Sequence, residues 1–169
     1  FKEIQPHLIL SVPLIIEKIY RKRIKPFLEK PLPNFACKLP FLKTVIKNKI
    51  QKKLNEIFGG NFHEVVIGGA PLNAEVEKFL KTINFPYTIG YGMTECGPLI
   101  SYDNWKNHKI NSVGKLVFTL EIRIASEKPD EIPGEILLKG ENLMNGYYKN
   151  SKEKKKTIDK NGWLHTGDL

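Results

Sequence analysis

In the first part of the chain, short apolar runs alternate with segments whose apolar residues recur at helical spacing. Residues 7–12, 64–67 and 86–89 have the length and composition of strands, and we expect the continuous run 7–12 to be buried on both faces. Residues 16–28 have helical spacing, and Pro26 predicts an end or a kink in that helix. With a helix before each later strand, this order predicts parallel βαβ units.

Two further helices are predicted in this part of the chain. Residues 73–83 form one, with Asn73 as its N-cap, and residues 41–58 form a longer one that ends at Gly59 and Gly60. The lysines of the longer helix lie largely off its apolar stripe, which consists of Leu42, Val45, Ile46, Ile50, Leu54 and Ile57. Such a helix either buries its stripe in the core or touches acidic lipid, and we favour the core. Residues 31–40 are a proline-rich connector.

The pattern changes after about Asn111. Residues 120–124 alternate apolar and polar side chains, residues 128–134 predict a turn, and residues 135–139 predict another strand. We therefore predict a mixed α/β fold with a partial α/β subdomain over 1–110. A small antiparallel β-barrel or sheet follows over 111–169, in which residues 152–156 form an exposed helix or loop.

Composition narrows the class of protein. The chain has 169 residues, 41% of them hydrophobic, which is enough to bury a core. Its net charge of +9 would suit nucleic acid, an acidic membrane surface or a phosphate-bearing ligand. The charge is mostly lysine spread along the chain, without an arginine-rich arm or a zinc spacing. A phosphate-bearing small molecule is the better prediction than nucleic acid.

Cysteine and histidine give no sign of a metal site. Cys37 and Cys96 are far apart, which favours a reduced cytoplasmic protein, although one disulfide stays open. His7, His63, His108 and His165 form no spaced cluster, and we expect each to be satisfied or exposed. The longest apolar run, 8–16, is about half of the roughly 20 residues that span a bilayer.

Two glycine-rich loops follow predicted parallel strands, where α/β folds bind ligands. Gly68 and Gly69 let the backbone approach a flat ligand closely, and Gly90 and Gly92 flank Tyr91, whose ring could stack on a base. Each feature alone is also typical of an ordinary turn or core position.

Polar side chains suited to phosphate, metal and sugar accompany these loops. Thr94 and Glu95 place a hydroxyl beside a carboxylate, which suits one phosphate oxygen and one Mg²⁺ ion. Asp168 is a carboxylate able to accept hydrogen bonds from two sugar hydroxyls. There is no Walker A pattern and no G-x-G-x-x-G. The residues alone thus predict an α/β domain that could bind a nucleotide.

Five segments taken together resemble the adenylate-forming (AMP-binding) enzyme superfamily. In chain order they are residues 68–72, 90–95, 112–115, 134–140 with 145–149, and 162–169. Residues 12–18, 57–60 and 143–148 are similar to the long-chain fatty acyl-CoA synthetases, although Asn145 and Ser151 depart from that subgroup's pattern.

The resemblance implies a ligase with ATP, Mg²⁺ and coenzyme A as cofactor and co-substrates. A fatty acid would form acyl-AMP and pass to coenzyme A, in the cytoplasm and in contact with a membrane. Tyr91 would stack on adenine against the segment Gly68, Gly69, Ala70 and Pro71. Thr94 would contact the α-phosphate, Glu95 would hold Mg²⁺ and Asp168 would bind the ribose. Gly90, Gly92 and Met93 would lie near the acyl carboxylate.

The sequence begins at Phe1 and stops directly after a motif, so we expect it to be part of a longer protein. The resemblance implies a phosphate loop before residue 1 and a lid domain with a catalytic lysine after residue 169, so we expect this piece alone to be inactive. Two other functions stay open. One is an adenylating enzyme for an aryl or medium-chain acid or for peptide synthesis, and the other is a basic interaction domain without catalysis.

Overall fold

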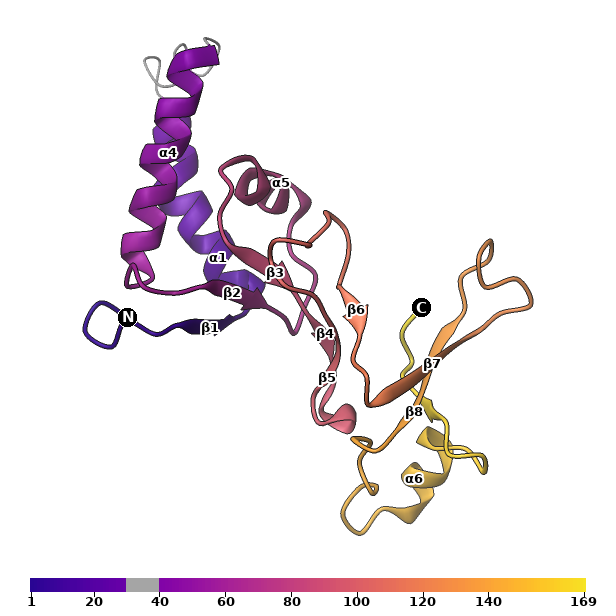
Figure 1. The fold of residues 1–169 in the computed structure, drawn as a ribbon. Coiled ribbons are helices and arrows are strands. Elements are labelled where there is room, and N and C mark those ends of the chain that lie inside the picture. Colours follow the sequence, from indigo (N-terminus) through magenta and orange to yellow (C-terminus); the bar gives the residue numbers. More distant parts are fainter. Residues whose placement is uncertain (30–39) are drawn as a thin grey trace. The chain divides into compact units, whose positions relative to one another are not determined.

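The computed structural model describes residues 1–29 and 40–169, which form two compact units (Figure 1). The first unit comprises residues 1–90 and 103–114, and the second comprises residues 91–102 and 115–169. The predicted division of the whole protein into subdomains at about residue 110 stays a prediction.

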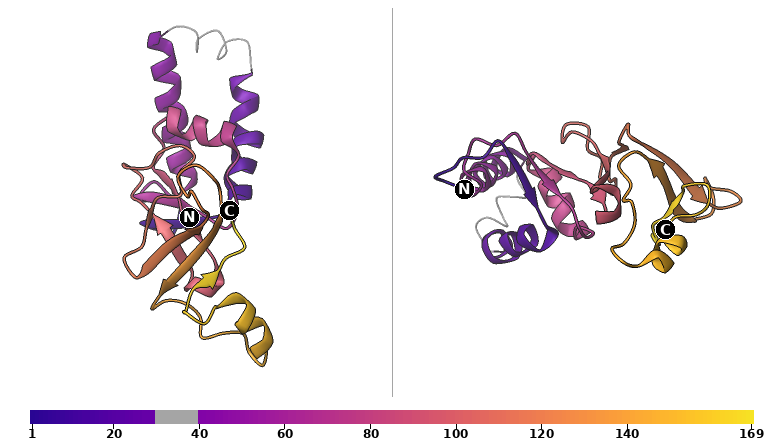
Figure 2. Two further views of the ribbon diagram at one scale, coloured as in Figure 1. Left: turned by 90° about the vertical axis from the view of Figure 1, so that its right-hand side faces the viewer. Right: turned by 90° about the horizontal axis from the view of Figure 1, so that it is seen from below.

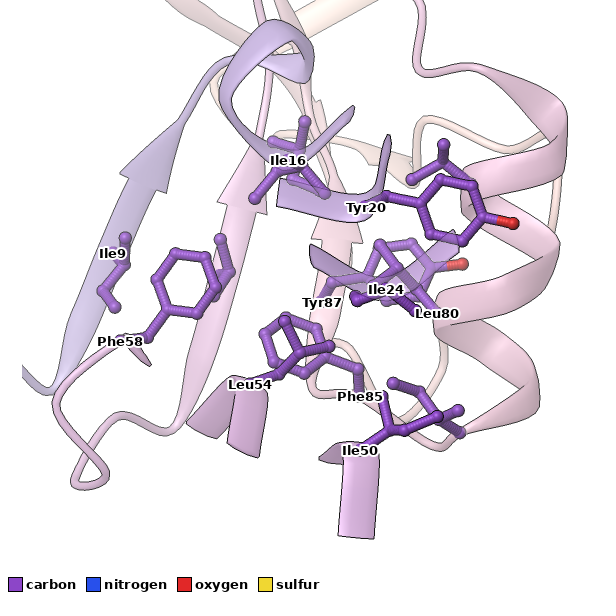
Figure 3. Packing of buried hydrophobic residues seen from close by; sticks show 14 of the residues in the cluster. Ile9, Ile16, Tyr20, Ile24, Ile50, Leu54, Phe58, Leu80, Phe85 and Tyr87 are labelled. Carbon is purple, nitrogen blue, oxygen red and sulfur yellow. The ribbon is translucent and has the colours of Figure 1, made fainter. Parts of the chain in front are cut away.

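The first unit is built on a parallel sheet. Its strands lie in the order β1 (Leu8–Ser11), β2 (Glu64–Ile67) and β3 (Tyr87–Ile89), and helix α5 (Ala74–Thr82) joins β2 to β3. The predicted βαβ arrangement is therefore confirmed. Side chains from the strands and the helices point toward one another in a single core, which includes Ile9, Ile16, Leu54, Phe58, Leu80 and Tyr87 (Figure 3).

The prediction that the first strand is buried on both faces is wrong. Among the described residues β1 stands at one end of the strand order, and its alternate side chains face opposite sides of the sheet. Ile9 is 3% exposed, whereas Leu8 and Leu10 are 55% and 77% exposed. Within the described residues, only the face that carries Ile9 is covered.

The helix after β1 is kinked at Pro26 rather than ended by it. Helix α1 (Pro13–Ile19) continues through a π-helical turn, η1 (Tyr20–Ile24), into the short helix α2 (Lys25–Leu28). The amide of Lys25 donates to the carbonyl of Tyr20, five residues earlier. Since Pro26 has no N–H to donate, the hydrogen-bonding pattern changes directly before it.

Helix α4 (Pro40–Ile57) confirms the predicted long helix and its end. Gly59 and Gly60 adopt φ values of 96° and 81°, and the Gly60 amide donates to the Asn55 carbonyl at 2.8 Å, which satisfies a carbonyl of the last turn. In the C-terminal half of the apolar stripe Ile50 and Leu54 are buried and Ile57 is half-buried, whereas Leu42 and Val45 near the N-terminal end are exposed. The predicted connector before α4 lies outside the described residues, except for Pro40.

The second unit contains two antiparallel sheets of three strands each. One has the order β4 (Tyr91–Gly92), β5 (Leu99–Tyr102) and β6 (Lys115–Leu116). The other has the order β7 (Leu120–Ala125), β8 (Glu135–Gly140) and β9 (Leu164–His165). Antiparallel structure was predicted for residues 111–169, and β7, β8 and β9 confirm it. The antiparallel pair β4 and β5 was not predicted, because residues 91–102 were assigned to the α/β part. The strands of residues 91–102 and 115–169 form these two open sheets and no closed barrel.

Two short helices complete the second unit. The 3₁₀ turn η2 (Thr94–Cys96) lies between β4 and β5, and α6 (Ser151–Thr157) lies between β8 and β9 with its four lysines exposed. The core of this unit is formed by fully buried Leu138 and Leu164, with Cys96 and Ile100. No helix in the described part of the chain is long and apolar enough to cross a membrane.

The N-cap of α5 gives a stability prediction. The side chain of Asn73 accepts hydrogen bonds from the amides of Glu75 at 3.0 Å and Val76 at 3.3 Å. Replacing Asn73 with Ala leaves these amides without that acceptor and should lower the free energy of unfolding by about 1 kcal/mol. Chemical denaturation of the full-length protein measures the loss, with Asn73→Asp as the control that keeps an acceptor. Equal stability of the Ala and Asp variants would show that the cap contributes nothing.

Candidate functional site

The closest pairing of predicted site residues is between Tyr91 and Asp168. Tyr91 begins β4 and Asp168 follows β9, and the Tyr91 hydroxyl donates to Asp168 Oδ2 at 2.5 Å across 77 residues of sequence. Both residues belong to the second unit. The structure thus brings together the residue predicted to stack on adenine and the one predicted to bind ribose.

Burial and the hydrogen bond act on the pKa of Tyr91 in the same direction. Burial, and then the bond to Asp168, raise the pKa of Tyr91 to about 12. The phenol therefore stays protonated at neutral pH and keeps its hydrogen-bond donor. Asp168 is exposed, so its carboxylate is accessible to a polyhydroxy ligand. The arrangement combines an oriented aromatic ring with an acceptor for sugar hydroxyls.

The segment around Asp168 is fastened to the start of β8. The Ile136 amide donates to the Asp168 carbonyl at 2.9 Å, and the Thr166 hydroxyl donates to the Ile136 carbonyl at 2.8 Å. Glu135 adds two bonds, accepting from the Gly167 amide at 2.9 Å and pairing with His165 Nδ1 at 2.8 Å. The bond to His165, followed by the Gly167 amide, lowers the pKa of Glu135.

Thr94 and Glu95 lie together on the turn η2. The Glu95 side chain accepts a hydrogen bond from the Tyr147 hydroxyl at 2.9 Å, and the Met144 amide donates to the Glu95 carbonyl at 2.8 Å. Asn142 donates to the Cys96 carbonyl at 2.6 Å. The loop between β8 and α6 therefore holds this turn at three points, and the Thr94 side chain is exposed beside the carboxylate.

A Mg²⁺ ion bound partly by phosphate fits this turn better than a metal held by protein alone. Within residues 1–29 and 40–169 no three His, Cys, Asp or Glu side chains form a group that could hold a metal. Mg²⁺ commonly uses one or two carboxylates together with substrate phosphates and water. Glu95 offers one such carboxylate, and its predicted metal role remains a prediction.

The remaining predicted residues fall partly in the first unit. Gly68 to Pro71 follow β2, and Gly90 follows β3, so both segments stand at the carboxyl ends of neighbouring parallel strands. Gly69 has a φ of 87°, a conformation that favours glycine. A Cβ on Gly68 would lie 3.2 Å from the Gly90 carbonyl oxygen, so the two segments approach closely.

Gly92 and Met93 belong to the second unit. A Cβ on Gly92 would collide with the Pro98 carbonyl, so the close pairing of β4 with β5 requires glycine there. Met93 packs against the core of the second unit. Their predicted place beside the acyl carboxylate stays a prediction, as does the stacking of adenine between Tyr91 and the glycine segment.

Sequence reasoning missed Glu135 and Tyr147. Both lie in motifs that were recognised, yet nothing in the sequence assigned them a partner, because those partners are 32 and 52 residues away. Cys96 is free and fully buried, and burial raises the pKa of its thiol to about 11, so it is a core residue. Cys37 lies outside the described residues.

Two of the histidines have carboxylate partners, as expected. His108 is buried against Glu77 with an Nε2–Oε1 distance of 3.1 Å, and His165 pairs with Glu135. His7 and His63 are exposed and stack with ring centroids 5.5 Å apart. Among the described residues these histidines contribute to no metal group.

Comparison with known proteins shows which proteins this chain resembles. Residues 1–148 match the family described as AMP-binding enzyme. Long chain acyl-CoA synthetase 3 of Arabidopsis thaliana is 32% identical over 98% of this chain and 29% of its own length. 4-Coumarate-CoA ligase 1 of Narcissus pseudonarcissus is 32% identical over 92% of this chain and 28% of its own length. The chain thus spans less than a third of these relatives.

A solved structure shares the fold. O-Succinylbenzoate coenzyme A synthetase from Bacillus subtilis, in complex with ATP and magnesium ion, superimposes with a TM-score of 0.64 at 21% identity. The similarity covers 98% of this chain and 29% of that one.

The Glu135 bonds predict an acid-sensitive contribution to stability. Because the pKa of Glu135 is lowered from 4.5 in the folded state, its contribution is fully present above that value and is lost as the pH falls through the lower folded-state pKa. Thermal unfolding of the full-length protein and its Glu135→Gln variant, between about pH 3 and pH 7, should show the variant less stable above pH 4.5 and the two converging in acid. A difference that does not change with pH would contradict this assignment.

Proposed function

Because the chain belongs to the family of AMP-binding enzymes, we propose that the full-length protein is an ATP-dependent acyl-CoA ligase. The observation that carries the proposal is the Tyr91–Asp168 pair, which presents a protonated phenol and an accessible carboxylate on one unit. An aromatic face suits a base, and a carboxylate suits the two hydroxyls of a ribose.

The proposed reaction has two steps. An acid carboxylate attacks the α-phosphorus of ATP, the bond to the bridging oxygen breaks, and pyrophosphate leaves with that electron pair. The thiolate of coenzyme A then attacks the acyl carbon, and AMP leaves with the bonding electrons of the acyl–oxygen bond. Both steps need the nucleotide held still while charge moves on its phosphate.

The residues of this chain serve orientation and charge in that reaction. Asp168 and Tyr91 hold the nucleoside, and the Thr94 hydroxyl donates to an α-phosphate oxygen. Glu95, held by the loop that carries Tyr147, provides the carboxylate for a Mg²⁺ ion. When bound, Mg²⁺ neutralises charge on the phosphates.

For the acid substrate we propose a long-chain fatty acid. The similarity to a long chain acyl-CoA synthetase over 98% of this chain supports that choice, while the similarity to a 4-coumarate-CoA ligase supports an aryl acid as the second candidate. The unpaired, buried Cys96 is in keeping with a proposed cytoplasmic location.

Acid-dependent exchange of pyrophosphate into ATP, followed by thioester formation with coenzyme A, tests the function in the full-length protein. The panel comprises palmitate, octanoate, 4-coumarate and o-succinylbenzoate. We expect the highest kcat/KM with palmitate. A preference for 4-coumarate would replace the fatty acid by the aryl acid, and no exchange with any acid would remove the proposed activity.

Replacing Glu95 tests the metal role. Glu95→Gln keeps the side-chain size and removes the charge, so acid-dependent exchange should fall by about 10²- to 10³-fold. The matched control is Glu141→Gln, an exposed carboxylate in the same loop region. A Glu95→Gln rate within a few-fold of the control would show that Glu95 does not carry the metal.

A further inference from the structure

The helical segment formed by α1, η1 and α2 and the helix α4 lie side by side in the first unit (Figure 2). Residues from both line a groove. One wall comes from α1, η1 and α2, and the other from α4. Its volume is about 420 Å³, in the range of pockets that bind small molecules. The apolar residues that line it are Ile19, Ile24, Phe27, Ile50, Leu54 and Ile57.

Among the described residues, three cations and no carboxylate line the groove. Arg23 comes from the first wall, and Lys49 and Lys53 come from the second. Within the described residues none of the three has an ion pair, whereas their neighbours Arg21 and Lys25 pair with Glu17 and Glu75. The three charges at the groove are therefore left uncompensated by the part of the chain that the structure describes.

The surrounding helices reinforce this imbalance. Residues 13–29 carry five cations and two carboxylates, and residues 40–57 carry five cations and one carboxylate. Like charges repel, so gathering ten cations along two helical segments that carry only three carboxylates is unfavourable. An anion in the groove would relieve that repulsion.

The apolar residues of the groove, which form its floor, indicate the chemistry of the uncharged part of the ligand. The accessible apolar surface of the floor comes from Phe27, which is 38% exposed, and from half-buried Ile19 and Ile57. Ile24, Ile50 and Leu54 lie beneath, at least 92% buried. Apolar surface at this groove gains free energy when a hydrocarbon displaces water from it. A ligand that satisfies both features has an apolar chain joined to an anionic head.

We propose that this groove binds a single-chain anionic amphiphile, with its chain on the apolar floor and its head group between Arg23, Lys49 and Lys53. The three exposed cations have long flexible stems and can follow either a carboxylate or a phosphate head. Binding here needs neither ATP nor coenzyme A, so it goes beyond the proposed ligase reaction.

The test is calorimetric titration of the full-length protein, without nucleotide, with three sixteen-carbon probes below their micelle concentrations. Palmitate has a carboxylate head, hexadecyl phosphate has a phosphate head, and hexadecanol has the same chain without charge. We expect the two anions to bind more tightly than hexadecanol. The stronger of the two anions identifies the preferred head group.

Two triple variants separate the groove from general surface charge. Arg23→Gln/Lys49→Gln/Lys53→Gln removes the cations of the groove, and Lys22→Gln/Lys47→Gln/Lys52→Gln removes three charges from the same helices outside it. The first should weaken hexadecyl phosphate binding by about tenfold, and the second by less than about twofold. Equal losses would assign the binding to diffuse electrostatics and overturn the proposal.

A third variant tests the floor without changing charge. Ile57→Trp places a larger side chain at the groove and should abolish hexadecyl phosphate binding, while pyrophosphate exchange in the same preparation shows that the protein is folded. Undiminished binding would overturn the proposal. Binding to anionic vesicles without binding of any monomeric probe would overturn it as well, in favour of a bilayer surface.

The two proposals can fail separately. If amphiphile binding is absent but pyrophosphate exchange occurs, only the groove proposal is refuted. If pyrophosphate exchange is absent but amphiphile binding occurs, only the ligase proposal is refuted. If the triple variant Arg23→Gln/Lys49→Gln/Lys53→Gln and Ile57→Trp both bind palmitate as tightly as the wild type, palmitate binds at another site. The groove then does not bind an amphiphile with a carboxylate head group.

Discussion

The hydrogen bond between Tyr91 and Asp168 joins the start of β4 to the segment after β9, and the proposed nucleotide site depends on it. The bond orients two groups at once, because the half-buried Tyr91 hydroxyl donates to one oxygen of the Asp168 carboxylate. The surrounding bonds serve the same end. Thr166 and Glu135 fasten the segment before Asp168 to β8, which is itself anchored in the core by fully buried Leu138.

The turn that carries Thr94 and Glu95 is supported in a similar way. The side chains of Thr94 and Glu95 reach the surface, whereas Cys96 in the same turn is fully buried. The loop from β8 to α6 donates hydrogen bonds to the turn, from Asn142 to the Cys96 carbonyl and from Tyr147 to the Glu95 carboxylate. Polar groups stabilise charge in a reaction most effectively when the surrounding structure already holds them in place, and the buried part of this turn holds Thr94 and Glu95 in that way. In the second unit, therefore, a few buried apolar residues hold Thr94 and Glu95, the residues for which the resemblance to adenylate-forming enzymes implies contacts with phosphate and Mg²⁺.

Much of the first unit could be predicted because its signals are local. The cap at Asn73, the stop at Gly59 and Gly60 and the kink before Pro26 each depend on neighbours within a few residues. The exposure of Leu8 and Leu10 in the described part of the chain could not be predicted, since it depends on which segments pack against β1. The partners of Glu135 and Glu95 were missed for the same reason, because they come from distant segments.

The most direct measurement compares the affinity of the full-length protein for AMP and for 2′,3′-dideoxy-AMP, in the wild type and in Asp168→Ala. Asp130→Ala, an exposed carboxylate in the same unit, is the control. If Asp168 holds the ribose, Asp168→Ala should lose about 10- to 100-fold in affinity for AMP and little for the dideoxy analogue, because only AMP offers the two hydroxyls. An unchanged preference for AMP in Asp168→Ala would contradict the account.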